Sequence, residues 1–585
     1  MSIDQSLLEK VRETAYKHAL LNAVKHEGKA DLKAVTSKVA AELPEVRKNM
    51  KAVIELVKSI VEEVNRLTLD EQLRIVKSNW PELLEEKVQE FKRELPPLPN
   101  AIEGKVVTRL APNPDFSLHL GNARPALLNY WYAKMYKGKM ILRFEDTDPR
   151  IKAPYPDTYE SIKMDLKWLG ISWDEEYVQS IRLPIFYEVA KELIKRGGAY
   201  VDLCDNKTFK VYRNQGKACP HRDKPVENQL NEFEKMLGGS YGEGEAVLRI
   251  KTDLHHVDIS VRDWVAFRVI DTTKTPHPIT GEKYIVWPTY NFAAAVDDHL
   301  MGVTHILRAK EHITNTVKQK YLYDHMGWKY PETIHFGRLS LEGVILSKSK
   351  TKKLIAEKGI ISYSDPRLGT IQGLRRRGIV KETVWELIKS VGVKGIDARI
   401  TLVNLYAINR AIVDPAANRY MAVEEPVYLV LRNIKDELKA LIPIHPSRKE
   451  HHTYVIADGA KVMVSKSDFH SVRSGLFRLM GLANFVVKGT WESEGMLVYV
   501  AELHSVEHDV AKKYNAPIIQ WVPETEHVKS VMLKPVGLEL EERTLYIERR
   551  VLNEKVDSIV QLYRIGFARV DSVHENAITL IFAHE

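Results

Sequence analysis

One segment, residues 105–144, constrains the fold of this chain more than any other. Residues 105–110 (KVVTRL) have the β-branched, apolar composition of a buried strand, and residues 111–115 (APNPD) form a turn rich in Pro and Asn. Residues 121–136 have the apolar spacing of an amphipathic helix, and residues 140–144 (MILRF) form a second strand. Strand, tight loop, helix and strand make the βαβ unit that opens a doubly wound, nucleotide-binding α/β domain.

Beyond this unit the sequence changes texture several times. A helical stretch at about residues 159–196 is followed by residues 200–285, which lose the α/β alternation and are predicted to be an insertion. The α/β pattern resumes near residues 284–308, and residues 361–415 are predicted to be helical. From about residue 419, short β-branched runs alternate with turn residues, which predicts β-barrels in the C-terminal third.

Composition limits the class of protein. At 585 residues the chain is too long for one core and fits about three or four domains, and its 44% hydrophobic residues exclude a disordered chain. No window approaches the ~20 apolar residues of a membrane span, and the first residues lack signal-peptide features. Two cysteines cannot form a disulfide framework, so we expect a cytoplasmic protein without a membrane partner. The 86 Lys and Arg residues against 78 Asp and Glu residues give a charge of +8, which permits a polyanionic partner.

Residues 1–99 are predicted to form a helical module ahead of the main body. They contain very little Gly and place apolar residues at helical spacing, as in Val53, Leu56, Val57, Ile60 and Val61. The stretch 95–99 (LPPLP) cannot continue a helix and is expected to be a semi-rigid linker. Two interpretations of the module stay open: a packed bundle without chemistry, or a docking surface for RNA or another protein.

The loop after the first strand is a candidate for chemistry. A strand-to-helix loop places His119 and the free N–H groups of the helix N-terminus at the carboxyl edge of the sheet, where the helix dipole favours a phosphate. Gly121 has no side chain, so a flat purine could approach the backbone closely. Taken alone the motif is weak, because a His near a helix start is more often an ordinary polar residue.

A second basic loop lies much later in the chain. Residues 344–350 (VILSKSK) offer Lys348 as a compact cation for phosphate charge that develops in a transition state. An isolated loop of this kind is more often a solvated basic segment. Its presence together with the His119 loop favours a site for a phosphate compound.

Together the two loops resemble the signatures of the class I aminoacyl-tRNA synthetases. Residues 119–122 (HLGN) are similar to His-Ile-Gly-His, and residues 345–349 (ILSKS) are similar to Lys-Met-Ser-Lys-Ser. Four further motifs are similar to those of the glutamyl-tRNA synthetases: residues 107–112 (VTRLAP), 143–149 (RFEDTDP), 287–292 (WPTYNF) and 297–308 (DDHLMGVTHILR). The resemblance covers residues 101–585 in order.

Two positions depart from the family signatures. Asn122 stands where the family usually has His, so an amide that can hydrogen-bond but cannot carry positive charge replaces one imidazole that would face ATP. Ile345 and Leu346 replace the leading Lys-Met and leave Lys348 as the cation. Asn122 also motivates an alternative interpretation, a non-catalytic tRNA-binding relative.

The resemblance implies ATP-dependent activation of an amino acid, followed by transfer to the 3′ end of tRNA. Positioning and electrostatic stabilisation are the main needs of such a reaction, and the resemblance assigns them to His119 and Lys348 with Mg²⁺ as the cofactor of ATP. It implies ATP contacts for His119, Gly121, Asn122, Ser347, Lys348 and Ser349.

Glutamate carries two carboxylates and one ammonium, so its pocket should contain fixed cations and an anion. Arg109, Glu145 and Arg308 fall at the carboxyl ends of predicted strands, where open α/β sheets bind ligands. By resemblance Glu145 receives the α-ammonium, and glutamate contacts are implied for Arg109, Ala111, Asn113, Glu145, Tyr290 and Arg308.

A glutaminyl-tRNA synthetase is the nearest alternative. A fixed guanidinium at Arg308 favours a carboxylate over an amide. Residues 144–148 (FEDTD) also differ from the Phe-Asp-Asp-Thr-Asn that is typical of the glutaminyl enzymes. Glutamate is therefore the predicted substrate.

The C-terminal half resembles the archaeal-type branch of the family. Residues 365–378, 404–410 and 518–523 are similar to its helical stem and its β-barrel anticodon-binding domains. We expect tRNA contacts at Arg375, Arg376, Arg377 and Gln520, with a solvated helix face as the alternative for the three arginines. Charging of tRNA(Gln) as well as tRNA(Glu) stays open.

Cys204, Cys219 and His221 resemble part of a zinc site found in some relatives as Cys-x-Cys with a later Cys-x-His. Asp202 stands where the first Cys would be, and zinc accepts carboxylate ligands, so four ligands are available. Because one ligand is substituted, we favour two buried thiols and expect no metal among the site residues.

We therefore predict an α/β multidomain chain with the domains of a class I synthetase. Residues 100–200 and 284–345 form the two halves of a Rossmann-like catalytic domain, and residues 201–283 form an inserted domain that binds the tRNA acceptor end. Residues 346–418 form the Ser-Lys-Ser loop and a helical stem, and residues 419–585 form all-β barrels for the anticodon. The expected partners are tRNA, L-glutamate and ATP, and we expect a monomer.

Overall fold

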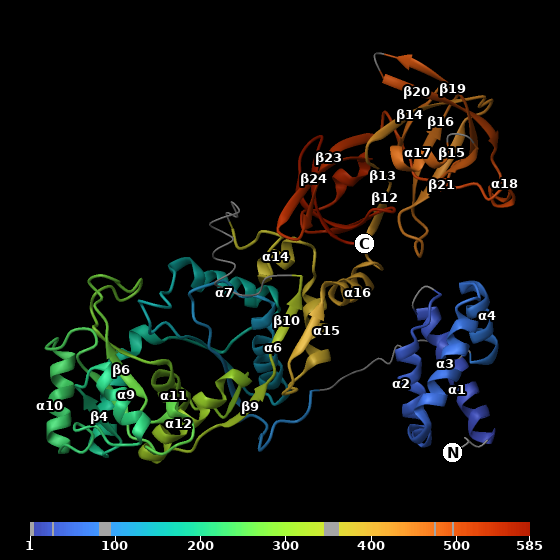
Figure 1. Cartoon of the computed structure of the whole chain (residues 1–585). Helices are drawn as coiled ribbons and strands as arrows, with labels where there is room; N and C mark the ends of the chain where they lie inside the picture. Colours follow the sequence, from blue (N-terminus) through green and yellow to red (C-terminus); the bar gives the residue numbers. More distant parts are fainter. Residues whose placement is uncertain (1–4, 26–27, 81–94, 344–361, 473–474, 494–495) are drawn as a thin grey trace. The chain divides into compact units, whose positions relative to one another are not determined.

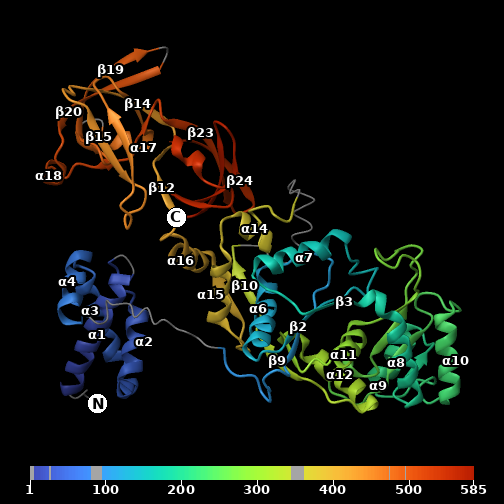
Figure 2. The same cartoon turned by 180° about the vertical axis from the view of Figure 1, so that it is seen from behind.

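The computed structural model describes residues 5–25, 28–80, 95–343, 362–472, 475–493 and 496–585 (Figures 1 and 2). The chain forms two compact units, residues 1–94 and residues 95–585, and each is described by itself. No described helix combines the length and the apolar character that crossing a bilayer requires.

The first unit is a helical bundle. Its helices are α1 (Gln5–Lys25), α2 (Leu32–Glu42), α3 (Met50–Val64) and α4 (Leu69–Asn79), with a 3₁₀ turn at Pro44–Asn49. Helix α3 buries Val53, Val57, Ile60, Val61 and Val64, so the predicted helical spacing is confirmed. Thr68 begins α4 with a capping box, in which the Thr68 hydroxyl accepts from Glu71 N and the Glu71 carboxylate accepts from Thr68 N.

The Pro-rich stretch 95–99 is not a free spacer. Tyr132 Oη donates to Pro96 O at 2.8 Å, Leu98 N donates to Tyr136 Oη at 2.9 Å, and the Leu98 side chain is buried. Both tyrosines come from one helix of the second unit, α6 (Leu120–Met135) or its C-cap. The stretch therefore belongs to the packing of this unit.

A parallel sheet organises the first part of the second unit, up to residue 336. Strands β1 (Val107–Leu110), β2 (Lys139–Phe144) and β3 (Glu175–Val178) pair in parallel, and β8 (His305–Ala309) pairs in parallel with β9 (Glu332–Phe336). Thr304 N donates to Val107 O at 3.0 Å, which places β8 beside β1. Helix α6 connects β1 to β2, so the predicted βαβ unit is confirmed.

The predicted helical stretch 159–196 is wrong in its middle. Helix α7 (Pro156–Trp168) ends before Gly170, whose φ of 74° cannot continue a right-handed helix, and α8 (Leu183–Lys195) begins after β3. Strand β3 was missed because its Glu and Tyr residues are only partly buried, so it lacks the apolar run of a core strand.

An antiparallel sheet forms the insertion. Its strands are β4 (Ala199–Asp202), β5 (Val247–Ile250), β6 (Val265–Val269) and β7 (Val286–Pro288), in that order. Helices α9 (Asn206–Gln215) and α10 (Val226–Leu237) accompany it. Its core is continuous with apolar residues of α11 (Tyr290–Leu300) and α12 (Ile313–Met326), so the insertion is packed onto the part of the unit that contains the parallel sheet.

The stem contains α14 (Ile371–Arg376), α15 (Lys381–Val391) and α16 (Leu402–Val413). One part of this predicted helical region is instead a strand, β11 (Ala398–Thr401), which pairs in parallel with β10 (Leu339–Glu342). The pairing partner lies about 60 residues earlier in the chain, so local periodicity could not reveal it.

The C-terminal third consists mainly of β-strands, as predicted, but it also contains two short helices, α17 (Lys466–Val472) and α18 (His508–Lys513), so it is not all-β. One seven-stranded sheet has the order β12 (Asn418–Tyr420), β25 (Ile559–Leu562), β26 (Gly566–Val573), β27 (Ile578–His584), β23 (His527–Val536), β24 (Glu539–Glu548), β13 (Ala422–Val423). The other has the order β21 (Ile518–Ile519), β18 (Leu476–Leu479), β19 (Asn484–Ser493), β20 (Met496–Ser505), β14 (Pro426–Arg432), β17 (Lys461–Ser465), β22 (Val522–Pro523). A hairpin of β15 (Leu438–Pro443) and β16 (His451–Ile456) adds to the barrel-like arrangement.

Candidate active site

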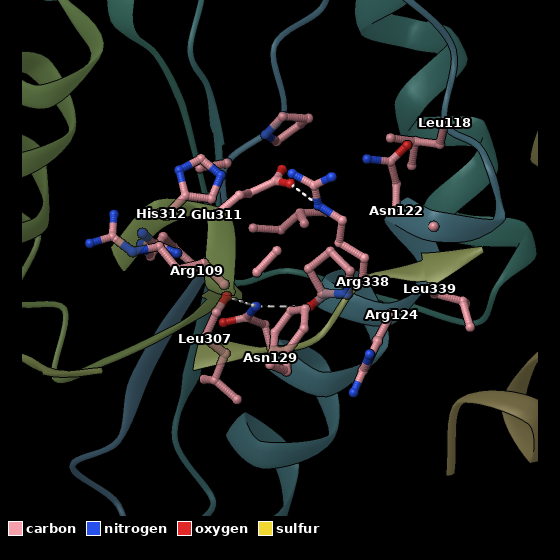
Figure 3. A pocket seen from close by; sticks show the side chains of 18 of the residues that line it. Arg109, Leu118, Asn122, Arg124, Asn129, Leu307, Glu311, His312, Arg338 and Leu339 are labelled. Carbon is pink, nitrogen blue, oxygen red and sulfur yellow. Dashed lines mark hydrogen bonds and ion pairs between the residues drawn. The ribbon is translucent and has the colours of Figure 1, made fainter. Parts of the chain in front are cut away.

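A cavity of about 780 Å³ opens at the carboxyl ends of the parallel strands (Figure 3). This volume lies within the range of about 300–1,000 Å³ that is usual for small-molecule sites. The cavity brings together eight of the predicted residues: Arg109, Ala111, His119, Gly121, Asn122, Glu145, Tyr290 and Arg308. Asn113 does not line it, and Ser347, Lys348 and Ser349 lie outside the described residues.

A buried ionic cluster forms one wall. Asp298 Oδ1 accepts from Arg109 Nε at 3.0 Å and from Arg143 Nη1 at 2.8 Å, and Arg143 Nη2 donates to Glu145 Oε1 at 3.0 Å. Burial raises the pKa of Glu145, although Arg143 and Arg109 oppose the shift. Burial alone would raise the pKa of Asp298 too, but Arg109 and Arg143 hold it below its usual range. Asp298 thus fixes the cation Arg109 and, through Arg143, the anion Glu145.

Arg308 has different neighbours. Its Nη2 donates to Thr316 Oγ1 at 2.6 Å, to Gln319 Oε1 at 2.9 Å and to Tyr330 Oη at 3.1 Å, and its Nη1 donates to Tyr290 Oη at 3.3 Å. Arg308 is 5% exposed. Within the described part of the chain it forms no ion pair, so its charge is held by neutral oxygen atoms alone.

The loop that begins α6 is held from two sides. Asn122 Oδ1 accepts from His119 N at 3.1 Å and thereby caps the helix, which explains how an amide serves at this position. A Cβ on Gly121 would lie 2.8 Å from His119 Cε1, so Gly121 makes room for the imidazole and not only for a ligand. On the stem side, Ile371 N donates to Leu118 O at 2.9 Å and Leu120 N donates to Gly369 O at 3.2 Å.

His119 is neutral at pH 7. Burial lowers its pKa to about 4, and its Nδ1 has no partner among the described residues. An imidazole in this state can offer a hydrogen bond to a phosphate or ribose oxygen but brings no positive charge. The cation expected from the Ser-Lys-Ser segment lies outside the described residues.

Sequence reasoning missed three groups of the cavity. His312 lies against the Tyr290 ring, and burial together with Arg308 and Arg109 lowers its pKa to about 4. Glu311 and Arg338 form an ion pair of 2.6 Å between two cavity walls (Figure 3). Glu311 and His312 directly follow β8, so the carboxyl-end rule that singled out Arg308 could have been extended to them.

The comparisons with known proteins agree with this site. Residues 105–414 match the family described as "tRNA synthetases class I (E and Q), catalytic domain". Residues 417–504 and 518–571 match two anticodon-binding domains of the same family. The chain belongs to the class I (E and Q) tRNA synthetases.

Relatives named glutamate–tRNA ligase match this chain over almost its whole length. A protein of Staphylothermus marinus named glutamate–tRNA ligase is 58% identical over 566 residues, which cover 97% of this chain and 100% of that protein. One of Hyperthermus butylicus with the same name is 51% identical over 582 residues, with the same shares. A solved glutamate–tRNA ligase of Elizabethkingia meningosepticum is 24% identical, with a TM-score of 0.39, and covers 54% of this chain and 70% of its own.

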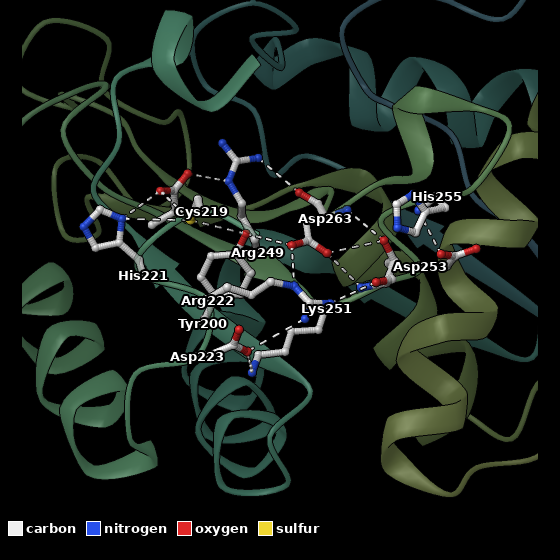
Figure 4. Close-up of polar contacts among 12 residues, drawn as sticks. Tyr200, Cys219, His221, Arg222, Asp223, Arg249, Lys251, Asp253, His255 and Asp263 are labelled. Atoms are coloured by element: carbon white, nitrogen blue, oxygen red, sulfur yellow. Dashed lines mark hydrogen bonds and ion pairs between the residues drawn. The ribbon is translucent and has the colours of Figure 1, made fainter. Parts of the chain in front are cut away.

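Four possible metal ligands meet in the insertion of this synthetase, and Figure 4 labels two of them, Cys219 and His221. The ligand atoms of Asp202, Cys204, Cys219 and His221 all lie within 4.8 Å of one another. His221 Nδ1 is 3.3 Å from Asp202 Oδ1 and 3.4 Å from Cys204 Sγ, and Cys219 Sγ is 3.5 Å from Asp202 Oδ1. The sequence favoured two buried thiols over zinc, but the structure gathers all four donors.

Three of the separations fit a tetrahedral zinc ion, and the separation of Cys219 Sγ and His221 Nδ1, 4.0 Å, is slightly longer. Bonds of about 2.3 Å to sulfur and about 2.0 Å to nitrogen or oxygen place tetrahedral ligands about 3.3–3.8 Å apart. Arg249 Nε donates to the other Asp202 oxygen at 2.7 Å and so fixes the carboxylate. Burial and the nearby Asp202 raise the pKa of Cys204 to about 12, so without a metal this thiol stays protonated. The donor set therefore suits Zn²⁺.

The predicted tRNA residues are placed differently from one another. Arg375 and Arg376, in α14, pair with Asp557, which precedes β25, and with Asp571, which lies in β26, at 3.0 and 2.8 Å. Arg377 lies over the Tyr406 ring. Gln520 is 4% exposed and its Oε1 accepts from Ala422 N, so the expected contact with tRNA has no accessible surface here. A sequence motif does not show that Gln520, between β21 and β22, is covered by the packing of the two sheets.

Proposed function

We propose that the chain is a glutamate–tRNA ligase that activates L-glutamate with ATP and transfers it to the 3′ end of tRNA(Glu). The charge balance of the cavity carries this proposal. At the end of the cavity where β1, β2 and β8 finish, the buried guanidiniums of Arg109, Arg143 and Arg308 outnumber the carboxylates of Asp298 and Glu145 by one, and this end therefore has one excess positive charge. Glutamate has a net charge of −1 and glutamine has none, so the cavity complements glutamate.

Each end of glutamate has a matching group. Glu145 can accept the α-ammonium, because its Oε1 is held by Arg143 and its side chain reaches the cavity. Arg308 can receive the side-chain carboxylate, because its charge has no carboxylate partner among the described residues. Arg109 and Tyr290 complete the pocket, and Ala111 leaves space beside them.

Activation needs the α-carboxylate of glutamate in line with the α-phosphorus of ATP. His119 and the N-terminus of α6 are placed to hold the nucleotide, and the amide of Asn122 keeps the His119 backbone in position. Mg²⁺ would bind the ATP phosphates and offset their charge. Lys348 is proposed to supply the cation that stabilises the charge developing on the phosphate chain, and Ser347 and Ser349 are proposed to contact ATP beside it.

The experiment is ATP–pyrophosphate exchange with glutamate or glutamine, each with and without tRNA. We expect exchange with glutamate. Exchange with glutamine alone would make the chain a glutaminyl-tRNA synthetase, and no exchange in any condition would leave only a non-catalytic tRNA-binding relative. Charging assays on tRNA(Glu) and tRNA(Gln) then define the tRNA substrate, which the anticodon-binding domains select.

The partners follow from the same proposal. Arg375 is half-exposed and remains the candidate of α14 for a tRNA phosphate, while Arg376 and Arg377 are more engaged with protein. Charging of tRNA predicts a cytoplasmic enzyme. We expect it to act as a monomer, with residues 1–99 as a bundle or docking module.

The insertion is proposed to hold a structural zinc ion through Asp202, Cys204, Cys219 and His221. Elemental analysis of the purified full chain should find about one zinc per chain, since the donors are gathered within 4.8 Å. Chelation should lower the melting temperature, and Cys204→Ser should abolish both the bound zinc and the effect of the chelator. If the purified chain contained no zinc and chelation did not change its melting temperature, Cys204 and Cys219 would be thiols that bind no metal.

A further inference from the structure

The two arginines of the cavity are held in opposite ways. Arg109 is fixed by a carboxylate, Asp298, whereas Arg308 is fixed by two hydroxyl groups of tyrosines, one of a threonine and one amide. A buried guanidinium is ordinarily stabilised best by a carboxylate. The neutral surroundings of Arg308 therefore call for a reason other than stability.

Gln319, on α12, makes this contrast sharpest. It is 0% exposed, and its Oε1 accepts from Arg308 Nη2 at 2.9 Å and from Tyr330 Oη at 2.8 Å. Both partners are donors, so the amide oxygen must be the atom that faces them. Its Nε2 is buried and has no hydrogen-bond partner among the described residues.

A glutamate at position 319 would suit the fold better. It has nearly the same shape, it would pair with Arg308, and it would remove the unpartnered NH₂ group that Gln319 buries. The amide is thus the less stable choice at this position. Its effect is to leave the charge of Arg308 uncompensated.

We propose that Gln319 is a specificity-determining positioning residue, which orients Arg308 without neutralising it and so reserves its charge for the side-chain carboxylate of the substrate. The inference rests on the proposed function, because it assumes that Arg308 reads that carboxylate. Thr316 and Tyr330 complete the cage, and each is also uncharged at neutral pH.

The proposal separates the two amino acids by charge. The carboxylate of glutamate gains from an unpaired guanidinium, whereas the amide of glutamine gains only a neutral hydrogen bond. A carboxylate at position 319 would occupy Arg308 and repel the side chain of glutamate, yet it would accept a hydrogen bond from the NH₂ of glutamine. The preference for glutamate should therefore narrow.

The test is Gln319→Glu in the full chain, assayed by ATP–pyrophosphate exchange in the presence of tRNA. The KM for glutamate and the inhibition constant of glutamine are both measured. We expect the KM for glutamate to rise by about 100-fold and the inhibition constant of glutamine to change by less than about threefold. Equal changes in both constants, or no change in either, would overturn the proposal.

Two variants separate charge from structure. Gln319→Met keeps the size and loses the hydrogen bond, so it should weaken both amino acids together and keep their ratio. Lys195→Gln makes the same change of one charge at an exposed residue that does not line the cavity and should leave both constants unchanged. If Gln319→Met and Gln319→Glu changed the ratio of the KM for glutamate to the inhibition constant of glutamine equally, Gln319 would have only a structural role. Should the wild-type chain fail to use glutamate, the proposed function fails instead.

Discussion

The arginines of the cavity and the arginines of α14 are embedded in opposite electrostatic surroundings. In the cavity, Arg308 is 5% exposed and has only neutral partners. At the end of α14, Arg376 shares Asp571 with Arg569, and Arg375 shares Asp557 with the same Arg569. The positive charge of Arg308 is thus unpaired in the cavity, where a small anion is expected to bind, whereas the charges of Arg375 and Arg376 are neutralised by carboxylates where two domains meet. The number of carboxylates nearby, rather than the residue type, distinguishes a binding arginine from a joining one.

The largest effect is expected where the charge is unpaired. Arg308→Gln should raise the KM for glutamate by about 100- to 1,000-fold, because the substrate carboxylate loses a buried cation. Steady-state exchange kinetics measure it. The matched variant Arg376→Gln makes the same change at the domain junction and should leave this KM within about threefold. Similar values for the two variants would erase the contrast between the regions.

A smaller effect is expected at the carboxylate that supports the cavity. Asp298→Asn leaves Arg109 and Arg143 buried without their shared partner, so kcat/KM for glutamate should fall about 10- to 100-fold and the free energy of unfolding by about 3 kcal/mol. Exchange kinetics and urea unfolding report the two quantities.

The neighbouring residue supplies the control. Asp297 pairs with Arg182 and Gln179, and neither of these lines the cavity. Asp297→Asn should therefore cost similar stability with less loss of kcat/KM. If both variants lost the same kcat/KM, Asp298 would matter for folding and not for the position of Arg109.

Eight of the nine described residues that the sequence predicted for ATP or glutamate line the cavity, for a physical reason. Parallel strands end at one edge, so Arg109, Glu145 and Arg308 had to come near one another once their strands were recognised. Local rules were also enough for the helices of the first unit and for the alternating strands of the last third.

Features that depend on distant partners could not be predicted. Strand β11 pairs with β10, and Gln319 contacts Arg308 through side chains alone. Asp298 lay within a motif used for the family resemblance, but nothing in that motif shows that one of its oxygens bridges two guanidiniums. The zinc ligands likewise depended on whether four residues converge, which only the fold decides.

As the pH falls, we expect His312 in the cavity to reduce the stability of the protein before the Arg376–Asp571 ion pair of the domain junction does. The pKa of His312 is lowered from 6.5 to about 4 by burial, Arg308 and Arg109, so the unfolded chain binds its proton at a higher pH than the folded chain. With respect to this group, the free energy of unfolding is therefore highest above pH 6.5, and it decreases as the pH falls from 6.5 towards 4. At the junction, burial acts to raise the pKa of Asp571, but Arg376 and Arg569 hold it below 3.8, so that contribution survives to lower pH.

Urea unfolding at pH 7.5 and pH 5.0 tests this order. Wild type should lose about 1–2 kcal/mol more than His312→Asn between the two values. Asp571→Asn should show the same loss as wild type over this interval. If His312→Asn lost as much unfolding free energy between pH 7.5 and pH 5.0 as wild type, groups other than His312 would govern the response to acid.

The smallest effect is expected at the junction itself. The Arg376–Asp571 pair is partly exposed, with side chains 35% and 17% accessible, so a double-mutant cycle of Arg376→Gln and Asp571→Asn should give a coupling energy of about 1 kcal/mol or less. The KM for tRNA should stay within about twofold in both single variants if Arg376 only joins the stem to the sheet that contains β26. If Arg376 contacts a tRNA phosphate instead, Arg376→Gln should raise this KM and Asp571→Asn, which frees the guanidinium, should lower it. Opposite changes of the KM for tRNA in the two variants would show that Arg376 binds tRNA. Asp571 would then compete with the tRNA phosphate for the Arg376 guanidinium.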